Sequence, residues 1–232
     1  MSRPPCKTLE EVKEYVGRQY WEDGLNSGCS GYQNETINWW WFLRWHQCFN
    51  QVVPLRDRSF LDLGCALGSM VSVALAAGGC DAHGVDLSEY AIEKGHKLFE
   101  QITNRTHAGS IHDLSRFPDK RFDVIYSMQV FEHLPEELTS AMVNEITRVA
   151  RDGALLWAGL VLGMGRSEDD KDLSHINIHP KEWWDAKFLA HGWIVDDETD
   201  RQLRQSTCGP DNPGFSYFKE YGWHTICYRK NT

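Results

Sequence analysis

The stretch Phe60-Leu61-Asp62-Leu63-Gly64-Cys65-Ala66-Leu67-Gly68-Ser69, followed by Gly84-Val85-Asp86-Leu87-Ser88, decides the fold of this chain. The first part runs from an apolar strand through a glycine-bearing turn into a helix, and the second part ends a strand on an acid. This order is typical of a βαβ unit that binds a nucleotide where strand carboxyl ends meet helix amino ends. Small residues in such a turn let the backbone approach a ligand closely.

Strands and helices alternate along the rest of the chain, which predicts a mostly parallel sheet with helices on both faces. We expect strands over 58–63, 81–85, 106–109, 122–127, 154–162, 193–195 and 223–229. We expect helices over 8–20, 34–53, 69–78, 88–103, 135–150 and 180–191. No linker divides the sequence, so we predict one domain over 1–232, with a helical lid segment over 1–55 and the sheet core over 56–232.

Composition disfavours several classes of protein. The chain has 232 residues and a formal net charge of −9, and binding along a nucleic-acid backbone usually needs a basic patch. No run reaches the roughly 18 apolar residues that cross a bilayer, and no secretory signal is visible. Seven cysteines at scattered spacings, without such a signal, are typical of reduced thiols. We therefore expect a cytoplasmic protein, and the sequence leaves its oligomeric state open.

Two acids at neighbouring strand tips indicate which nucleotide binds. Asp86 ends the second strand, where a carboxylate can accept hydrogen bonds from both hydroxyls of a ribose. Asp62 stands two residues before Gly64, where it would repel a pyrophosphate but would suit a ligand with an ammonium group. No glycine after Gly68 completes the dinucleotide fingerprint, which places a dehydrogenase last. S-adenosylmethionine carries both an ammonium group and a ribose.

These motifs, in this order, resemble those of the class I S-adenosylmethionine-dependent methyltransferases, most of all the UbiE/type 11 branch, which acts mainly on small molecules. Two further stretches strengthen the resemblance, Phe122-Asp123-Val124-Ile125-Tyr126-Ser127 and Phe131-Glu132-His133-Leu134. The resemblance covers roughly 58–195. It implies an α/β fold with a Rossmann-like, seven-stranded, mostly parallel sheet whose last strand is antiparallel, with helices on both faces and an N-terminal helical lid.

The resemblance also implies how the cofactor is held. Asp62, Gly64 and Gly68 would surround its methionine end, and Asp86 would hold the ribose, with Leu87 against the adenine. Ser110, or Asp113 from another register, would bind the adenine N6, and Ala66 replaces the usual middle glycine of the turn. Tyr20 and Tyr32 are candidates for a lid over the cofactor. The predicted cofactor-binding residues are Tyr20, Tyr32, Asp62, Gly64, Cys65, Ala66, Gly68, Asp86, Leu87, Ser110, Ile111, His112 and Gln129.

Methyl transfer is an in-line displacement at a sulfonium carbon, so the protein must align the acceptor, exclude water and receive a proton from a hydroxyl acceptor. His133 follows the fourth strand and His175 the fifth, which makes both candidate bases at the carboxyl edge of the sheet. We expect O-methylation of a small molecule such as a natural product, a sugar or a quinone-like compound, without a metal. Asp169, Asp170 and Asp172 are expected to form a solvated loop.

Two other functions stay open. Gln129, Glu132, His133 and His175 resemble the Glu-x-x-Glu-His…His set of RNA 3′-terminal methyltransferases, in which a divalent ion holds two ribose hydroxyls for 2′-O-methylation. Gln129 in place of the first glutamate weakens a site for a hard cation. The other alternative is a non-catalytic subunit that binds the cofactor and activates or stabilises a second protein.

Overall fold

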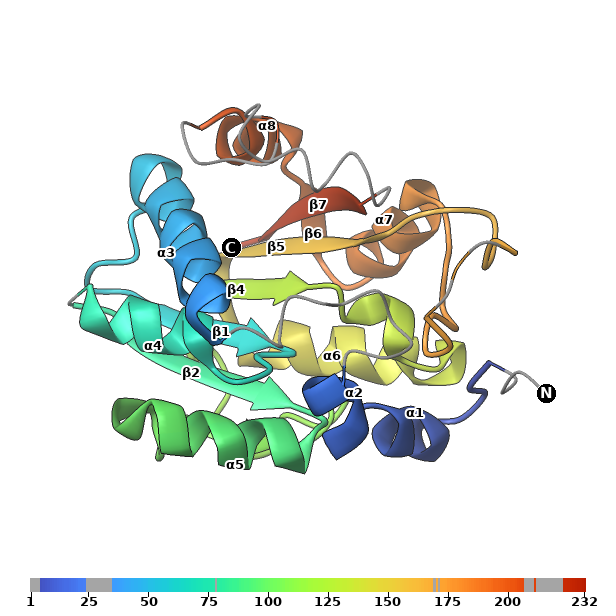
Figure 1. Cartoon of the computed structure of the whole chain (residues 1–232). Coiled ribbons are helices and arrows are strands. Elements are labelled where there is room, and N and C mark those ends of the chain that lie inside the picture. Colours follow the sequence, from blue (N-terminus) through green and yellow to red (C-terminus); the bar gives the residue numbers. More distant parts are fainter. Residues whose placement is uncertain are drawn as a thin grey trace.

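A seven-stranded sheet lies at the centre of the computed structural model, which describes residues 5–23, 35–77, 79–168, 170, 172–206, 211 and 223–232. Its strands are β1 (Ser59–Leu63), β2 (Asp81–Asp86), β3 (Thr106–Ala108), β4 (Phe122–Met128), β5 (Ala150–Val161), β6 (Trp193–Val195) and β7 (Trp223–Lys230). They pair in the order β3-β2-β1-β4-β5-β7-β6 (Figure 1). β7 is antiparallel to both β5 and β6, and the other neighbouring pairs are parallel. The predicted fold class is confirmed.

Helices lie on both faces of this sheet and at its carboxyl edge (Figure 1). They are α1 (Leu9–Tyr15), α2 (Arg18–Asp23), α3 (Glu35–Val52), α4 (Ser69–Ala76), α5 (Glu89–Leu98), α6 (Thr139–Val149), α7 (Lys181–Leu189) and α8 (Asp197–Gln205). Three 3₁₀ turns follow α5 or β4, namely η2 (Glu100–Ile102), η3 (Phe131–His133) and η4 (Glu136–Leu138). None of the helices in the described part of the chain is long and apolar enough to cross a membrane.

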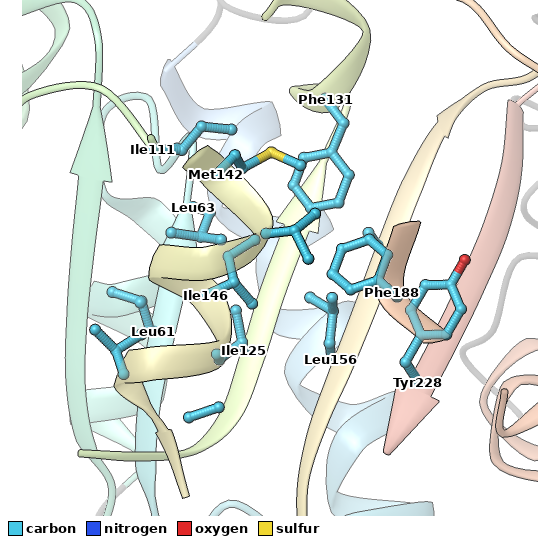
Figure 2. Packing of buried hydrophobic residues seen from close by; sticks show 14 of the residues in the cluster. Leu61, Leu63, Ile111, Ile125, Phe131, Met142, Ile146, Leu156, Phe188 and Tyr228 are labelled. Carbon is cyan, nitrogen blue, oxygen red and sulfur yellow. The ribbon is translucent and has the colours of Figure 1, made fainter. Parts of the chain in front are cut away.

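Alternating side chains of the strands divide the core into two layers. On one face, Phe60 of β1 packs in a cluster to which α3, α4, α5 and α8 contribute, with Phe49 as the large buried side chain of α3. On the other face, Leu61 packs with side chains of α6 and α7, among them Ile146 and Phe188 (Figure 2). Both faces of β1 are therefore buried, as expected for a central parallel strand.

The N-terminal helices pack against the carboxyl edge of the sheet rather than against a face. Trp21 of α2 lies in a cluster with Ala66 and Leu67, which belong to the turn after β1. Its indole nitrogen donates a hydrogen bond to Ser88 Oγ at 2.9 Å, just past the end of β2. Further along the edge, the Cys6 N–H donates to the Leu173 carbonyl at 2.8 Å. Residues near the start of the chain thus contact loops that follow β1, β2 and β5.

Several predicted boundaries shift for local reasons. The helix predicted over 8–20 breaks into α1 and α2 around Gly17, because glycine disfavours helix interiors. The helix predicted over 135–150 begins as the separate turn η4, and β5 begins directly after α6. No element was predicted over helix α8, because Leu203 is its one buried residue and no apolar period marks it. Its start signal was present, since the Asp196 carboxylate accepts a hydrogen bond from the Thr199 N–H at 3.0 Å.

Gly95 tests how tightly α5 packs on the turn after β1. A Cβ at this position would lie 2.3 Å from the Leu67 carbonyl oxygen, which belongs to the backbone and cannot rotate away. We expect Gly95→Ala to lower the free energy of unfolding by about 1–3 kcal/mol, although alanine favours a helix by ~1 kcal/mol. Denaturant titration measures the change. Lys97→Ala, on the exposed face of the same helix, is the control and should stay within about 0.5 kcal/mol of the native protein. Equal stability of both variants would contradict this packing.

Candidate functional site

The turn between β1 and α4 is held by the carboxylate at the tip of β2. Asp86 Oδ2 accepts a hydrogen bond from the Ala66 N–H at 2.8 Å, and Oδ1 accepts one from the Ser88 N–H at 2.8 Å. Ala66 has a φ of 51°, a left-handed conformation that is uncommon outside glycine. Gly64 and Gly68 flank it with φ of 75° and 74°, where a side chain would be strained. The predicted turn and the predicted acid therefore form one hydrogen-bonded unit.

Asp62 and Asp86 form a buried acidic pair, with exposed fractions of 2% and 8%. Burial raises the pKa of Asp86 to about 6, against the opposing effect of its two backbone hydrogen bonds. Burial, and then the charge of Asp86, raise the pKa of Asp62 well above its usual value. No cationic side chain of the described residues contributes to either pKa. A ligand that brings a positive charge and hydroxyl donors would relieve this arrangement, and S-adenosylmethionine fits that requirement.

Cys65 lies in the same turn and is buried. Burial raises the pKa of its thiol well above the usual value, and the charges of Asp62 and Asp86 raise it further. A thiol with a raised pKa is a poor nucleophile at neutral pH. Cys65 therefore fills the turn as a small apolar side chain, and its predicted part in cofactor binding stays a proposal.

A cavity of about 400 Å³ opens beside the tip of β2. Ser110 and His112 line it, and the Ser110 hydroxyl lies 2.6 Å from His112 Nδ1. Asp113, the alternative partner for the adenine, lines the same cavity. Ile111 instead packs its side chain into the core cluster with Val85. Three of these four neighbouring residues thus line a cavity that also reaches Val85, the residue before Asp86.

Aromatic and apolar residues of the N-terminal helices cover the turn. Tyr20 packs against the cluster of Trp21, Ala66 and Leu67, and its ring centroid lies 5.2 Å from that of Trp21. Tyr20 and Leu87 also border a second cluster that contains side chains of α1. Trp21 was not among the predicted site residues, although it is adjacent to Tyr20 in sequence. Tyr32, the other predicted lid residue, lies outside the described residues.

Gln129 follows β4 with a φ of 58°, the second left-handed non-glycine residue at this edge. Its N–H donates to the Gly159 carbonyl at 2.7 Å, which fixes its backbone against β5. Its side-chain nitrogen is buried and has no hydrogen-bond partner among the described residues. Such backbone strain costs of order 1–3 kcal/mol, and an unpaired buried donor adds a cost of about 1–3 kcal/mol. Both features are typical of a residue that a ligand contacts.

The two candidate bases, His133 and His175, lie close together in the structure. His133 is hydrogen-bonded to Ser174, which lies 41 positions further along the chain and directly before His175. The ring centroids of the two histidines lie 4.8 Å apart. His133 Nδ1 lies 2.8 Å from Ser174 Oγ, which donates to Asp172 Oδ1 at 2.5 Å. His175 Nδ1 lies 2.8 Å from Asp170 Oδ2. The predicted pair is therefore a connected hydrogen-bonded cluster at the ends of β4 and β5.

Asp170 and Asp172 correct the expectation of a solvated acidic loop. Asp172 is 4% exposed, and Asp170 is partly buried against His175. The loop folds back over η3, where the Ile176 N–H donates to the Glu132 carbonyl at 2.9 Å. A run of acids by itself predicts solvent exposure, and this tertiary contact left no signal in the local sequence.

Glu132 is a functional candidate that the sequence analysis named only in the alternative metal set and not among the catalytic or cofactor-binding residues. It is fully buried, and its Oε1 accepts a hydrogen bond from the Val161 N–H at 3.3 Å. Its Oε2 is buried without a hydrogen-bond partner among the described residues. Burial raises the pKa of Glu132 to about 7, and the charge of His175 opposes that rise. Burial, and then His175, lower the pKa of His133 to about 4, so its imidazole is neutral at pH 7.

Comparison with known proteins agrees with this geometry. Residues 61–158 match the family model described as a methyltransferase domain. The ubiquinone biosynthesis O-methyltransferase of Coxiella burnetii (strain RSA 493 / Nine Mile phase I) is 31% identical over 109 residues, which are 46% of this chain and 45% of that protein. The probable chloroplastic tocopherol O-methyltransferase of Oryza sativa subsp. japonica is 31% identical over 102 residues, which are 43% of this chain and 28% of that protein.

A solved structure extends the comparison to nearly the whole chain. Haemonchus contortus phosphoethanolamine N-methyltransferase 2, solved with phosphomonomethylethanolamine and S-adenosylhomocysteine, aligns with a TM-score of 0.66 and 17% identity. The alignment covers 95% of this chain and 61% of that one, and at this identity it shows the fold alone. The chain spans less than half the length of the two curated relatives. Together these matches confirm the resemblance to the class I S-adenosylmethionine-dependent methyltransferases.

Proposed function

We propose that this protein transfers a methyl group from S-adenosylmethionine to an oxygen of a small molecule. One observation carries the proposal: Asp62 and Asp86 are buried at neighbouring strand tips, and none of the described residues places a cationic side chain against them. Asp62 lies in β1 just before the turn, and Asp86 holds the backbone of that turn through the Ala66 N–H. Both residues fall inside the matched methyltransferase domain. When bound, the cofactor supplies a methyl group on a positively charged sulfur.

On the cofactor side, residues of this chain would bind S-adenosylmethionine and enclose it. We infer that Asp86 accepts hydrogen bonds from the ribose hydroxyls and that Asp62 faces the positively charged amino-acid end. The cavity lined by Ser110 and His112 takes the adenine. Tyr20 and Trp21, packed over the turn, exclude water from the buried acids. Exclusion of water strengthens the attraction between those carboxylates and a cationic ligand.

On the acceptor side, His133 and His175 lie at the ends of β4 and β5, next to the cofactor crevice at β1 and β2. Each imidazole has its Nδ1 held by a neighbour, Ser174 for His133 and Asp170 for His175. Fixed rings of this kind can orient an acceptor hydroxyl and help it to lose its proton. The names of both curated relatives, O-methyltransferases for ubiquinone biosynthesis and for tocopherol, support a phenolic or quinone-like acceptor.

Substitution of Asp86 tests the cofactor site. We expect Asp86→Ala to weaken binding of S-adenosylmethionine by at least about tenfold, because hydrogen bonds to a charged group contribute roughly 1.5–3 kcal/mol each. Asp86→Asn, which keeps the size of the side chain, should show the same direction if Asp86→Ala loses its fold. Isothermal titration calorimetry measures the affinity and circular dichroism checks the fold. Asp152→Ala is the matched control, because Asp152 is exposed and pairs with Lys120 away from the site. Native affinity in both Asp86 variants would contradict the ribose contact.

The raised pKa of Asp86 makes cofactor binding dependent on pH. Asp86 has a pKa of about 6 without ligand, and its charged form is the better acceptor for two hydroxyls and the better partner for a cation. Affinity for S-adenosylmethionine should therefore fall as the pH decreases through about 6, by up to about tenfold per pH unit. Calorimetry from pH 8 to pH 5 measures this, with thermal unfolding as the check that the fold persists. An affinity that rises toward pH 5 would contradict the prediction.

Methyl transfer itself is tested with labelled cofactor and a panel of phenolic, catechol and sugar acceptors, followed by mass spectrometry for a gain of one methylene. We expect a phenolic or catechol acceptor to react. His133→Ala and His175→Ala should each lower turnover by about 10²–10⁴-fold and leave cofactor affinity unchanged, because they act on the acceptor. His191→Ala is the control, since His191 lies at the far end of α7 and contacts the Lys187 carbonyl. Full turnover in both histidine variants would remove them from the reaction.

A further inference from the structure

We propose that Glu132, His133 and His175 bind a divalent transition-metal ion such as Zn²⁺ on the acceptor side of the site. Each residue offers one possible ligand atom, and these three atoms lie within 4.8 Å of one another. Glu132 and His133 belong to η3 after β4, and His175 belongs to the loop after β5. The cluster therefore lies at the same edge of the sheet as Asp62 and Asp86. The sequence predicts no metal for the small-molecule function and offers these residues as ion ligands only in the alternative of an RNA 2′-O-methyltransferase.

The hydrogen bonds around the two histidines leave the same ring nitrogen available on each. Ser174 Oγ gives its proton to Asp172 Oδ1, so it accepts the Nδ1–H of His133. Asp170 Oδ2 is an acceptor, so His175 also carries its proton on Nδ1. Both Nε2 atoms then hold a lone pair. Metal-binding histidines are usually oriented in this way, with the other ring N–H donated to a carboxylate, a carbonyl or a water.

The third ligand is the unpaired oxygen of Glu132. Oε1 of this fully buried side chain is held by the Val161 N–H, and Oε2 is buried with no hydrogen-bond partner among the described residues. A buried carboxylate oxygen without a donor is costly, and a cation is the partner that best offsets this cost. A bound ion would displace any proton from this carboxyl group and from the two ring nitrogens that face it.

The surrounding charges favour a cation. Asp170 and Asp172 add two carboxylates to that of Glu132, and Asp172 Oδ2 lies 4.0 Å from His175 Nε2. Arg166, at 4.0 Å from Asp170, is the basic side chain that the described residues bring to this group of acids. The three carboxyl groups outnumber the one guanidinium near them, so their arrangement favours a divalent ion.

The ligand types select the class of ion. Two imidazoles and one carboxylate suit Zn²⁺, Co²⁺ or Fe²⁺, whereas Mg²⁺ and Ca²⁺ prefer oxygen ligands. Bonds of about 2.0–2.2 Å place ligand atoms roughly 3.3 Å apart, so a bound ion would draw the three side chains together from their present spacing of up to 4.8 Å. Three protein ligands also leave positions open for oxygens of a substrate, as in catalytic rather than structural sites.

The role of this ion in the reaction rests on the proposed function. A cation beside the acceptor lowers the pKa of a hydroxyl that binds it, so the hydroxyl proton can pass to solvent rather than directly to an imidazole. The oxygen then forms its bond to the methyl carbon while the sulfur keeps the electron pair of the broken bond and becomes a neutral thioether. In this arrangement His133 and His175 act as ligands. A catechol acceptor, with two adjacent hydroxyls, matches two open positions.

Zn²⁺ titration of the full chain after removal of metals with a chelator tests the binding. We expect one site in the native protein and at least about tenfold weaker binding in Glu132→Gln, which keeps the size of the side chain, and in His175→Ala. Co²⁺ should give visible absorption bands in the native protein that these variants lose. His179→Ala is the matched control, because His179 lies in the same loop but stacks on Trp183 with centroids 3.8 Å apart.

Two outcomes would overturn the proposal: no Zn²⁺ site in the native protein, or a site that the Glu132 and His175 variants leave unchanged. Calorimetry with S-adenosylmethionine on the same variants separates this result from a failure of the proposed function. If the protein shows no Zn²⁺ site but binds S-adenosylmethionine and transfers the methyl group in its metal-free form, the metal site is contradicted and the proposed function is supported. If the native protein binds Zn²⁺ but does not bind S-adenosylmethionine, the metal site is supported and the proposed function is contradicted.

Discussion

The site depends on one carboxylate and on the hydrogen bonds that it accepts from two backbone N–H groups. Asp86 joins the turn after β1, through Ala66, to the start of α5, through Ser88. This pair of hydrogen bonds holds Ala66 in a conformation that alanine rarely adopts and places both strand tips in one fixed frame. Among the described residues no cation faces this buried carboxylate, which is why we propose that a positively charged ligand completes the frame. Stability and ligand binding thus make opposite demands on the same side chain.

The order of the strands explains why the two halves of the site lie side by side. The chain proceeds from β1 to β2 and β3 in one direction and from β4 to β5 in the other, so the direction reverses between β1 and β4. Crevices at such a reversal are the usual ligand sites of open α/β sheets. Backbone groups and two carboxylates form the side of β1 and β2, whereas two imidazoles among carboxyl groups form the side of β4 and β5. A donor with a positive charge and an acceptor with a hydroxyl need these different surroundings.

Much of the fold and of the cofactor side could be predicted because its signals are local. Asp62, the glycine turn and Asp86 lie within one βαβ unit, where spacing along the chain determines position at the sheet edge. The acceptor side could be predicted only in part, because it depends on contacts such as His133 with Ser174, which no local pattern encodes. Asp170 and Asp172 illustrate the limit: the same acids would be solvated if the loop did not fold over η3. Helix α8 was missed for a related reason, since Leu203 alone faces the core.

The placement of the N-terminal segment has a consequence for the sequence of events in a catalytic cycle. Trp21 rests on the turn beside Asp86, and Cys6 is tied to Leu173 in the loop that leads to His175. The N-terminal segment therefore contacts both the cofactor side and the acceptor side of the candidate site. In the proposed reaction, donor and acceptor would both pass this segment, so the rate of its movement would limit both their binding and the release of the thioether product.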